Sequence, residues 1–189
     1  MPLYEYYGSD VSLSFVASAS SGSSWSTSLG TADANRLIIV CVGSAGGTPP
    51  TGVTVDGVAA TLAISNGAAK IWYAQATANV TGTTTLTGGS SPTLQGIGVY
   101  AAYNLPSLTP SAVGTGVDHT TVVVPANGFV VGCGERTAGT ISGWLGITRD
   151  YTATVSGDDF SSASTTVVGS QSILATATNA GAMALAAWG

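Results

Sequence analysis

Charged residues are scarce in this chain, and basic residues are the scarcest. Lysine and arginine occupy 4 of the 189 positions and aspartate and glutamate 9, so 7% of the residues are charged, against about 25% in a typical domain. Nucleic-acid binding needs several clustered cations that displace counterions from phosphates. The four basic residues are isolated from one another and the net charge is −5, so we expect no nucleic-acid partner.

Long apolar runs are also missing, although 44% of the residues are hydrophobic and the mean hydropathy is +0.38. No run approaches the roughly 18 residues that a membrane-spanning helix needs. We therefore expect no membrane partner. The abundant glycine, alanine, serine and threonine instead suit a protein whose surface is covered by hydroxyl groups or by neighbours in an assembly.

Cysteine and histidine are nearly absent. Cys41 and Cys133 both lie within apolar, strand-like runs, which predicts two buried free thiols in place of a disulfide. His119 is the single histidine. A zinc site, which is normally built from cysteine and histidine, is therefore not expected.

A secretory signal is not visible at the start of the sequence. Met1 to Tyr7 contains neither a basic segment nor an apolar segment of the kind that an export signal requires. We expect a protein that is made in the cytoplasm without such a signal.

The patterns that are present indicate β-structure. Leu37 to Val42 is a continuous apolar, β-branched run closed by glycine, which predicts a strand buried on both faces. Val11 to Phe15 alternates between apolar and polar residues, as a half-buried strand does. The Ser-rich stretch from Ser18 to Gly30 is expected to be a loop. Further strands are expected at 53–55, 58–62, 70–74, 83–87, 96–103, 120–124, 129–133, 143–148, 165–169, 172–176 and 182–188.

Three dipeptides predict tight hairpins. Asp56-Gly57, Asn66-Gly67 and Asn127-Gly128 each stand between strand-like segments, and such pairs readily adopt the positive φ values of type I′ turns. Residues 182–188 have the propensity of a helix, but the segment is short and terminal, and we predict a closing strand. Leu105 to Gly116, with two prolines, is the clearest break in the pattern.

Together these features predict an all-β fold, an antiparallel β-sandwich of the jelly-roll type. No repeat of fixed period stands out. We expect residues 1–33 to be an N-terminal arm, or a first strand followed by the Ser-rich loop, and residues 34–189 to be a single sandwich domain.

The order of the segments resembles a known family. The segments that carry the resemblance are Asn35 to Val40, Val53 to Leu62, Ile71-Trp72-Tyr73, Thr83 to Thr87, Val99 to Leu105, Ala126 to Val131 and an Ala-rich last strand that ends in Trp188. This order is similar to a β-sandwich module of bacteriophage virion proteins that also occurs in some bacterial surface or secreted proteins. The resemblance implies a structural or adhesive module, with no shared catalytic residues to transfer.

Catalytic groups are few and badly spaced. Asp118 and His119 are neighbours on an expected strand, where adjacent side chains point to opposite faces, so Asp118 is not expected to orient His119. The two glutamates, Glu5 and Glu135, do not form the facing pair of a glycosidase. Asp158-Asp159, with Asp150 as a candidate third ligand, is the best calcium candidate, but two aspartates in a Ser/Gly loop are more typical of a solvated turn. We expect no catalytic residues, no metal and no cofactor.

Aromatic residues supply the remaining candidates. Trp25 and Trp144 lie in or near expected loops and could stack on a sugar, or could pack over the ends of the sandwich. Tyr4, Tyr6 and Tyr7 give the first residues an aromatic character that suits an interface with a partner subunit.

The sequence therefore predicts a non-enzymatic phage virion protein that is made in the host cytoplasm. The favoured role is a capsid decoration, or cement, protein that docks on the major capsid protein or another virion subunit and stabilises the particle. A homotrimer at a three-fold capsid position is the simplest homo-oligomer that fits this role. The alternative is a carbohydrate- or receptor-binding adhesin module associated with the tail or fibres.

Overall fold

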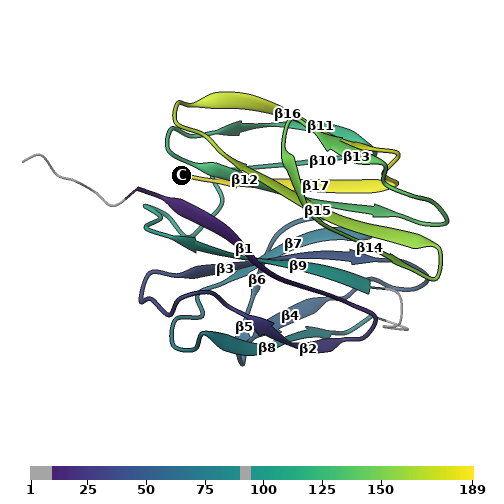
Figure 1. The fold of residues 1–189 in the computed structure, drawn as a ribbon, viewed down its shortest axis with the longest axis horizontal. Helices are drawn as coiled ribbons and strands as arrows, with labels where there is room; N and C mark the ends of the chain where they lie inside the picture. Colours follow the sequence, from purple (N-terminus) through teal and green to yellow (C-terminus); the bar gives the residue numbers. More distant parts are fainter. Residues whose placement is uncertain (1–9, 90–94) are drawn as a thin grey trace, which may run out of the picture.

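The computed structural model describes residues 10–89 and 95–189, and every regular element in them is a β-strand (Figure 1). All the strand pairs are antiparallel. The predicted all-β sandwich class is therefore confirmed. In the described part of the chain there is no helix long and apolar enough to cross a membrane.

The first half of the chain forms two sheets. Its strands are β1 (Ser12–Ser20), β2 (Ser24–Ser28), β3 (Leu37–Ser44), β4 (Gly52–Val55), β5 (Val58–Ala59), β6 (Thr61–Asn66), β7 (Ala69–Ala74), β8 (Thr81–Thr87) and β9 (Gln95–Tyr103). The first inner sheet has the order β1-β9-β3-β7-β6, and the first outer sheet has the order β2-β8-β4-β5. Leaving out β6, this is the strand order of an eight-stranded jelly roll.

The second half also forms two sheets. Its strands are β10 (Ala112–Gly116), β11 (His119–Val124), β12 (Phe129–Arg136), β13 (Gly143–Leu145), β14 (Thr148–Val155), β15 (Asp158–Thr166), β16 (Gln171–Thr178) and β17 (Ala182–Trp188). The second inner sheet has the order β10-β17-β12-β15-β14, and the second outer sheet has the order β11-β16-β13. The segment around Pro106 and Pro110, predicted as a break, links the two halves.

The strand order of the second half repeats that of the first. In the inner sheets, β1, β9, β3, β7 and β6 correspond to β10, β17, β12, β15 and β14. In the outer sheets, β2, β8 and β4 correspond to β11, β16 and β13, and β5 has no counterpart. The described residues thus form two sandwiches, where a single one was expected over 34–189. The sequence keeps only a trace of this repeat: Ala34-Asn35 and Cys41 recur as Ala126-Asn127 and Cys133, 92 residues later in both cases.

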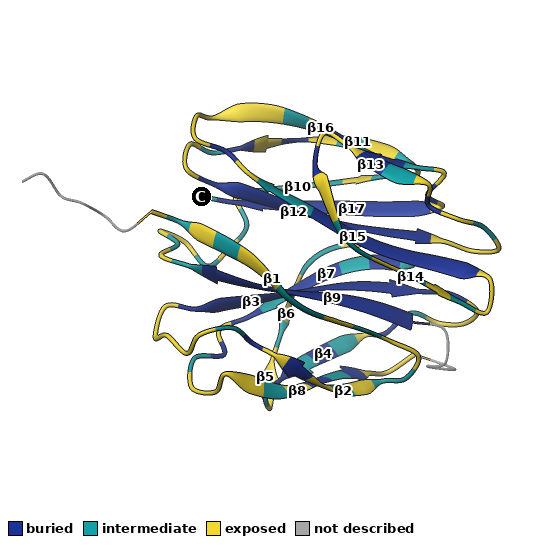
Figure 2. Cartoon of the chain, viewed as in Figure 1, coloured by how far each residue is buried: buried dark blue, intermediate teal, exposed yellow. Residues whose placement is uncertain are grey.

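The four sheets stack as four layers with three cores between them (Figure 1). One core lies between the sheets of the first half, one between those of the second half, and one between the two inner sheets. The inner strands β3, β9, β12 and β17 are therefore buried on both faces, whereas the outer sheets carry exposed residues (Figure 2). The predicted double burial of Leu37 to Val42, and the predicted closing strand at 182–188, are both confirmed.

The predicted hairpins have different outcomes. Asp56-Gly57 joins β4 to β5, and both residues have positive φ (51° and 79°), as a type I′ turn requires. Asn66 and Ala69 pair across the turn between β6 and β7, so that hairpin is also confirmed. The hairpin at Asn127-Gly128 was predicted wrongly, because β11 and β12 belong to different sheets and the turn carries the chain from one layer to the next.

Two predicted loops are strands. The Ser-rich stretch contains the end of β1 and all of β2, in which Trp25 and Thr27 face the core while the intervening serines face solvent. Asp158 and Asp159 begin β15 and are buried, so the expectation of a solvated turn was wrong. Aspartate in strands is unusual, and here the loop after β12 supplies N–H groups to both carboxylates, whereas the Ser24 hydroxyl bonds to Thr85 on the neighbouring strand.

Candidate interaction surfaces

The outer face of the second outer sheet, hereafter the apolar face, exposes large hydrophobic side chains. Val123 on β11, Leu174 on β16 and Leu145 on β13 are 57%, 56% and 66% exposed. They come from all three strands of the sheet. Clusters of exposed hydrophobic residues on a soluble protein commonly mark a surface that binds another molecule.

The strand register brings these residues into one patch. Thr121 pairs with Leu174, Val123 with Ser172, and Leu145 with Thr176. Leu174 is therefore the diagonal neighbour of both Val123 and Leu145, and diagonal neighbours on one face of an antiparallel sheet lie about 7–8 Å apart, within reach of long side chains. None of the residues in β11, β13 and β16 is Asp, Glu, Lys or Arg, so the three strands bring no acidic, lysine or arginine side chain to the apolar face.

The outer face of the first outer sheet has the opposite character and is hereafter the hydroxyl face. Its exposed positions along β2 and β8 are serine and threonine, in opposed pairs: Ser24 with Thr85, Ser26 with Thr83, and Ser28 with Thr81. The hydroxyls of Ser24 and Thr85 are 3.0 Å apart and hydrogen-bonded. The outer face of β2 and β8 therefore presents a row of hydroxyl groups.

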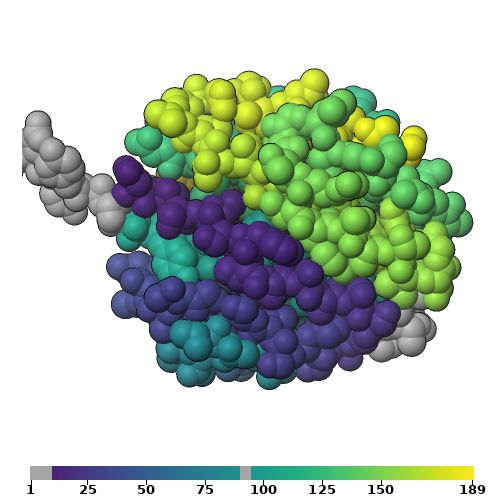
Figure 3. Space-filling model, in the orientation of Figure 1, coloured from purple at the N-terminus to yellow at the C-terminus, as the bar shows by residue number. Residues whose placement is uncertain are grey.

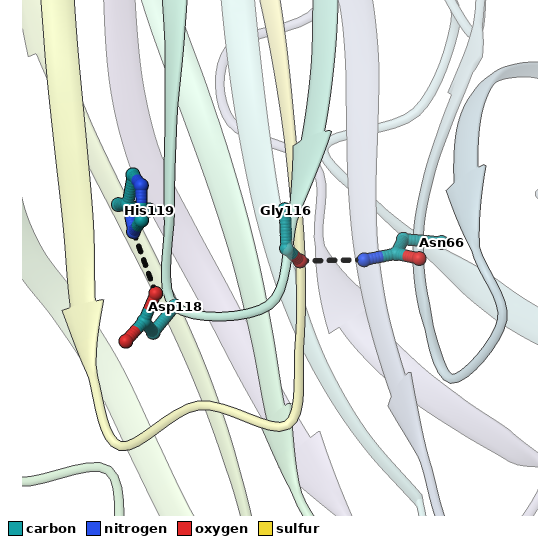
Figure 4. A network of polar contacts seen from close by, with 4 residues as sticks. All are labelled: Asn66, Gly116, Asp118 and His119. Carbon is teal, nitrogen blue, oxygen red and sulfur yellow. Dashed lines mark hydrogen bonds and ion pairs between the residues drawn. The ribbon is translucent and has the colours of Figure 1, made fainter.

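Asp118 and His119 are hydrogen-bonded, contrary to expectation. The distance from His119 Nδ1 to Asp118 Oδ1 is 2.6 Å, because Asp118 lies in the turn before β11 and is free of the strand alternation (Figure 4). The His119 side chain is 68% exposed and the Asp118 side chain is 51% exposed. The aspartate of a catalytic triad is buried, where it can hold the imidazole in place. This pair is instead a solvated contact on the surface.

The carboxylates of Asp158 and Asp159 accept backbone N–H groups, and the Glu135 carboxylate accepts the Thr137 hydroxyl. Asp158 Oδ1 accepts from the Ala138 N–H at 2.6 Å, and Asp159 Oδ2 accepts from the Ile141 N–H at 2.9 Å. Burial raises the pKa of Glu135, and the hydrogen bond from Thr137 opposes that rise. Within residues 10–89 and 95–189, no group of three or more His, Cys, Asp and Glu side chains is placed to hold a metal ion.

A polar contact joins the two halves at the edge of their shared core. The Tyr100 hydroxyl on β9 donates to Asp150 Oδ2 on β14 at 3.0 Å, and the Ser164 hydroxyl donates to the same oxygen at 2.7 Å. Burial raises the pKa of Asp150 above its ordinary value, although both hydrogen bonds oppose this. The Tyr151 hydroxyl donates to the Ala19 carbonyl at 3.1 Å, which ties β14 to β1 along the boundary that Figure 3 shows between the halves.

The aromatic candidates are distributed differently from the expectation. Trp144 is buried in the core of the second half, and its Nε1–H donates to the Ser161 hydroxyl at 2.8 Å, so it packs and is not presented to a ligand. Trp25 is partly buried against the core of the first half. Tyr4, Tyr6 and Tyr7, with Glu5, lie outside the described residues.

The sequence patterns did not predict the apolar face, and they did not assign the surface hydroxyl groups to particular strands. A signal for the hydroxyl face exists, since threonine recurs at every second position from Thr81 to Thr87. Leu174 and Leu145 give no such signal, because an apolar residue in a strand is usually read as core. No protein-family model, no curated protein and no solved structure matches this chain.

Proposed function

We propose that this protein is a non-enzymatic structural protein of a bacteriophage particle, a decoration protein that docks on coat subunits. The observation that carries the proposal is the apolar face, an uncharged sheet surface with Val123, Leu145 and Leu174 more than half exposed. The partner that fits it is a coat subunit with an apolar, uncharged surface, because a charged partner would lose hydration there without gaining a counterion.

The stacked architecture supports a mechanical role. The apolar face is one side of a second sandwich whose other side is fixed to the first through a shared core. Burying one Leu or Val side chain fully is worth about 1.5–3 kcal/mol, so three side chains already more than half exposed would contribute roughly 1 kcal/mol or more each on docking. Repeated over many copies on a particle, such contacts would resist expansion of the coat.

The hydroxyl face supports an orientation for this docking. It lies on the opposite outer sheet, so a molecule that docks through the apolar face turns its serines and threonines toward water. The proposal also predicts that a partner subunit contacts Tyr4, Tyr6 and Tyr7. It further predicts that the protein forms a homotrimer. A glycan-binding role is not carried further, since the two tryptophans expected to stack on sugar pack against the cores.

Particle association tests the proposal. Particles of the phage that carries this gene are purified and analysed by mass spectrometry, and particles grown without the gene are incubated with the purified protein. We expect the protein in the first sample and saturable binding in the second. Leu174→Asp places a carboxylate in the contact, and we expect at least tenfold weaker binding, equivalent to about 1.4 kcal/mol.

The matched control is Val168→Asp, which changes an equally apolar residue that is 86% exposed in the turn after β15. This variant should bind as the unchanged protein does. Absence of the protein from purified particles would overturn the proposal. Equal binding by Leu174→Asp would show that another surface makes the contact.

A further inference from the structure

The only two cysteines of the chain occupy equivalent places in its two halves. Cys41 is the fifth residue of β3 and Cys133 is the fifth residue of β12, its counterpart in the repeated strand order. Each is 1% exposed, and both belong to the core between the inner sheets. The repeat therefore places one thiol on each side of the junction between the halves.

The two side chains meet across that junction. The Cys41 thiol donates to the carbonyl of Gly132, the residue before Cys133, at an Sγ-to-O distance of 3.6 Å. Both cysteines line the same small internal void, together with Gly43, Gly96 and Gly98. A disulfide needs Cα atoms about 4.4–6.8 Å apart, closer than the roughly 10 Å at which sheets usually stack.

Small residues are what allow the two sheets to approach here. Cys41 pairs with Gly98 on β9, and Cys133 pairs with Ala184 on β17. Residue pairs of β3 and β12 come within 8 Å between their Cα atoms. Gly98 adds no side chain beside Cys41, and Phe160 and Ser162 pack against the glycines of this void.

We propose that Cys41 and Cys133 form an intrachain disulfide that locks the two halves together when the chain meets a small-molecule disulfide such as oxidised glutathione. Both thiols are free in the structure described above, which is thus the reduced form. The proposal rests on the junction between the halves and does not depend on the function proposed for the apolar face.

The reaction is a pair of thiol–disulfide exchanges. One cysteine thiolate attacks a sulfur of oxidised glutathione, which forms a mixed disulfide and releases one glutathione thiolate. The second cysteine thiolate then attacks the protein sulfur of the mixed disulfide and releases the other glutathione thiolate. The protein loses two electrons and glutathione disulfide gains them, and the two thiol protons pass to the released glutathione thiolates.

The buried position sets when this exchange takes place. The void is too small for a glutathione adduct, so exchange occurs while the chain folds or when the junction opens. Burial also raises the pKa of the Cys41 thiol well above its ordinary value, and the neighbouring Cys133 adds to the rise. The closed reduced protein is therefore slow to oxidise, and the closed oxidised protein is slow to be reduced.

Refolding the unmodified chain in two glutathione buffers tests the proposal. Unfolded protein is diluted into oxidised or reduced glutathione, and free thiols, intact mass and thermal unfolding are measured. In the oxidised buffer we expect a monomer that has lost both thiols and two hydrogen atoms and retains the circular dichroism of the reduced form. A peptide map should contain the Cys41–Cys133 link, and the melting temperature should rise by roughly 5 to 10 °C.

Cys41→Ala and Cys133→Ala are matched controls, because each leaves one cysteine that cannot close a ring. Their melting temperatures should be the same in the two buffers. Wild-type protein that refolds with both thiols free, or with glutathione on each, would overturn the proposal, as would an oxidised monomer that melts lower than the reduced one. If the alanine variants do not fold, the two forms of the unmodified chain still decide the question.

Discussion

Arg36 is the largest charged side chain in the interior, and its role is to hold loops together. Its guanidinium, 0% exposed, donates to the carbonyls of Ala76 (2.7 Å), Gly30 (3.1 Å), Thr31 (2.9 Å) and Asn79 (2.7 Å). The planar fork of arginine can satisfy several acceptors in one plane, which a lysine ammonium cannot. One side chain thus connects the segment before β3 to the segment before β8.

Arg36→Met tests this role. The change leaves the buried Ala76 carbonyl and three partly buried carbonyl groups with fewer partners, and we expect a loss of about 3–5 kcal/mol in the free energy of unfolding. Arg36→Lys should lose somewhat less, because it restores one donor group. Arg149→Met, at an exposed arginine on β14, is the control and should change stability by less than about 0.5 kcal/mol. Equilibrium unfolding in urea measures all three.

Asp150 makes stability depend on pH in the mildly acidic range. Burial raises its pKa in the folded state above the ordinary value of 3.8, so the folded protein holds the proton more tightly than the unfolded chain does. Stability therefore falls as pH rises from 3.8 through the raised pKa, and is flat for this group below 3.8. Asp150→Asn removes the titration while keeping an acceptor for Tyr100 and Ser164.

The measurement is the free energy of unfolding of both proteins at a series of pH values. The asparagine variant should gain stability relative to the unmodified protein as pH increases through that window. Glu135, whose pKa is also raised by burial, titrates in both proteins and cancels in the difference. A difference that does not vary with pH would show that Asp150 is not responsible.

At the scale of the elements, strand β15 of the second half packs against the first inner sheet through the Phe160 side chain. Phe160 on β15 lies against Gly43 on β3 and Gly96 on β9, where an added Cβ would come within 2.6 and 2.7 Å of Phe160 atoms. The Phe160 ring therefore occupies the space that side chains at Gly43 and Gly96 would fill. This explains why two adjacent strands of the first inner sheet have glycine at paired positions.

In Gly96→Ala the added methyl group should clash with Phe160 and lower the free energy of unfolding by about 1–3 kcal/mol. Gly169→Ala is the matched control, because a Cβ there meets no atom within 4 Å. In a double-mutant cycle, adding Phe160→Leu to Gly96→Ala should cost less than Phe160→Leu does alone. Additive losses would contradict the proposed contact between the two positions.

An element could be predicted from sequence when its own residues determine its structure, and could not when distant residues do. β3 and β17 were predictable because inner strands are apolar on both faces, and Asp56-Gly57 was predictable because its turn is set locally. β15 was not, because its aspartates are satisfied by residues some 20 positions away. The apolar face escaped prediction for the same reason: whether Leu174 is core or surface depends on which layer β16 joins.

At the scale of the molecule, the two halves share a core that neither could bury alone. Leu37, Ile39 and Tyr100 of the first half pack with Phe129 and Trp188 of the second. The Asn66 side chain adds a polar tie, since its Nδ2 donates to the Gly116 carbonyl at 2.6 Å (Figure 4) and to the Met183 carbonyl at 3.2 Å. A repeat joined in this way should behave as one cooperative unit in place of two independent domains.

Trp188→Ala tests whether that unit is single. Trp188 stacks on Phe129 of its own half, with ring centroids 5.5 Å apart, and meets Tyr73 of the other half edge-on at 6.1 Å. Its removal should lower the free energy of unfolding by about 3–5 kcal/mol. If the halves unfold together, amide hydrogen exchange should accelerate equally in β3 and in β12, because both are protected by the same global opening. Acceleration confined to β12 and β17 would show instead that the second sandwich opens independently, with the shared core serving as an interface between two separately folding units.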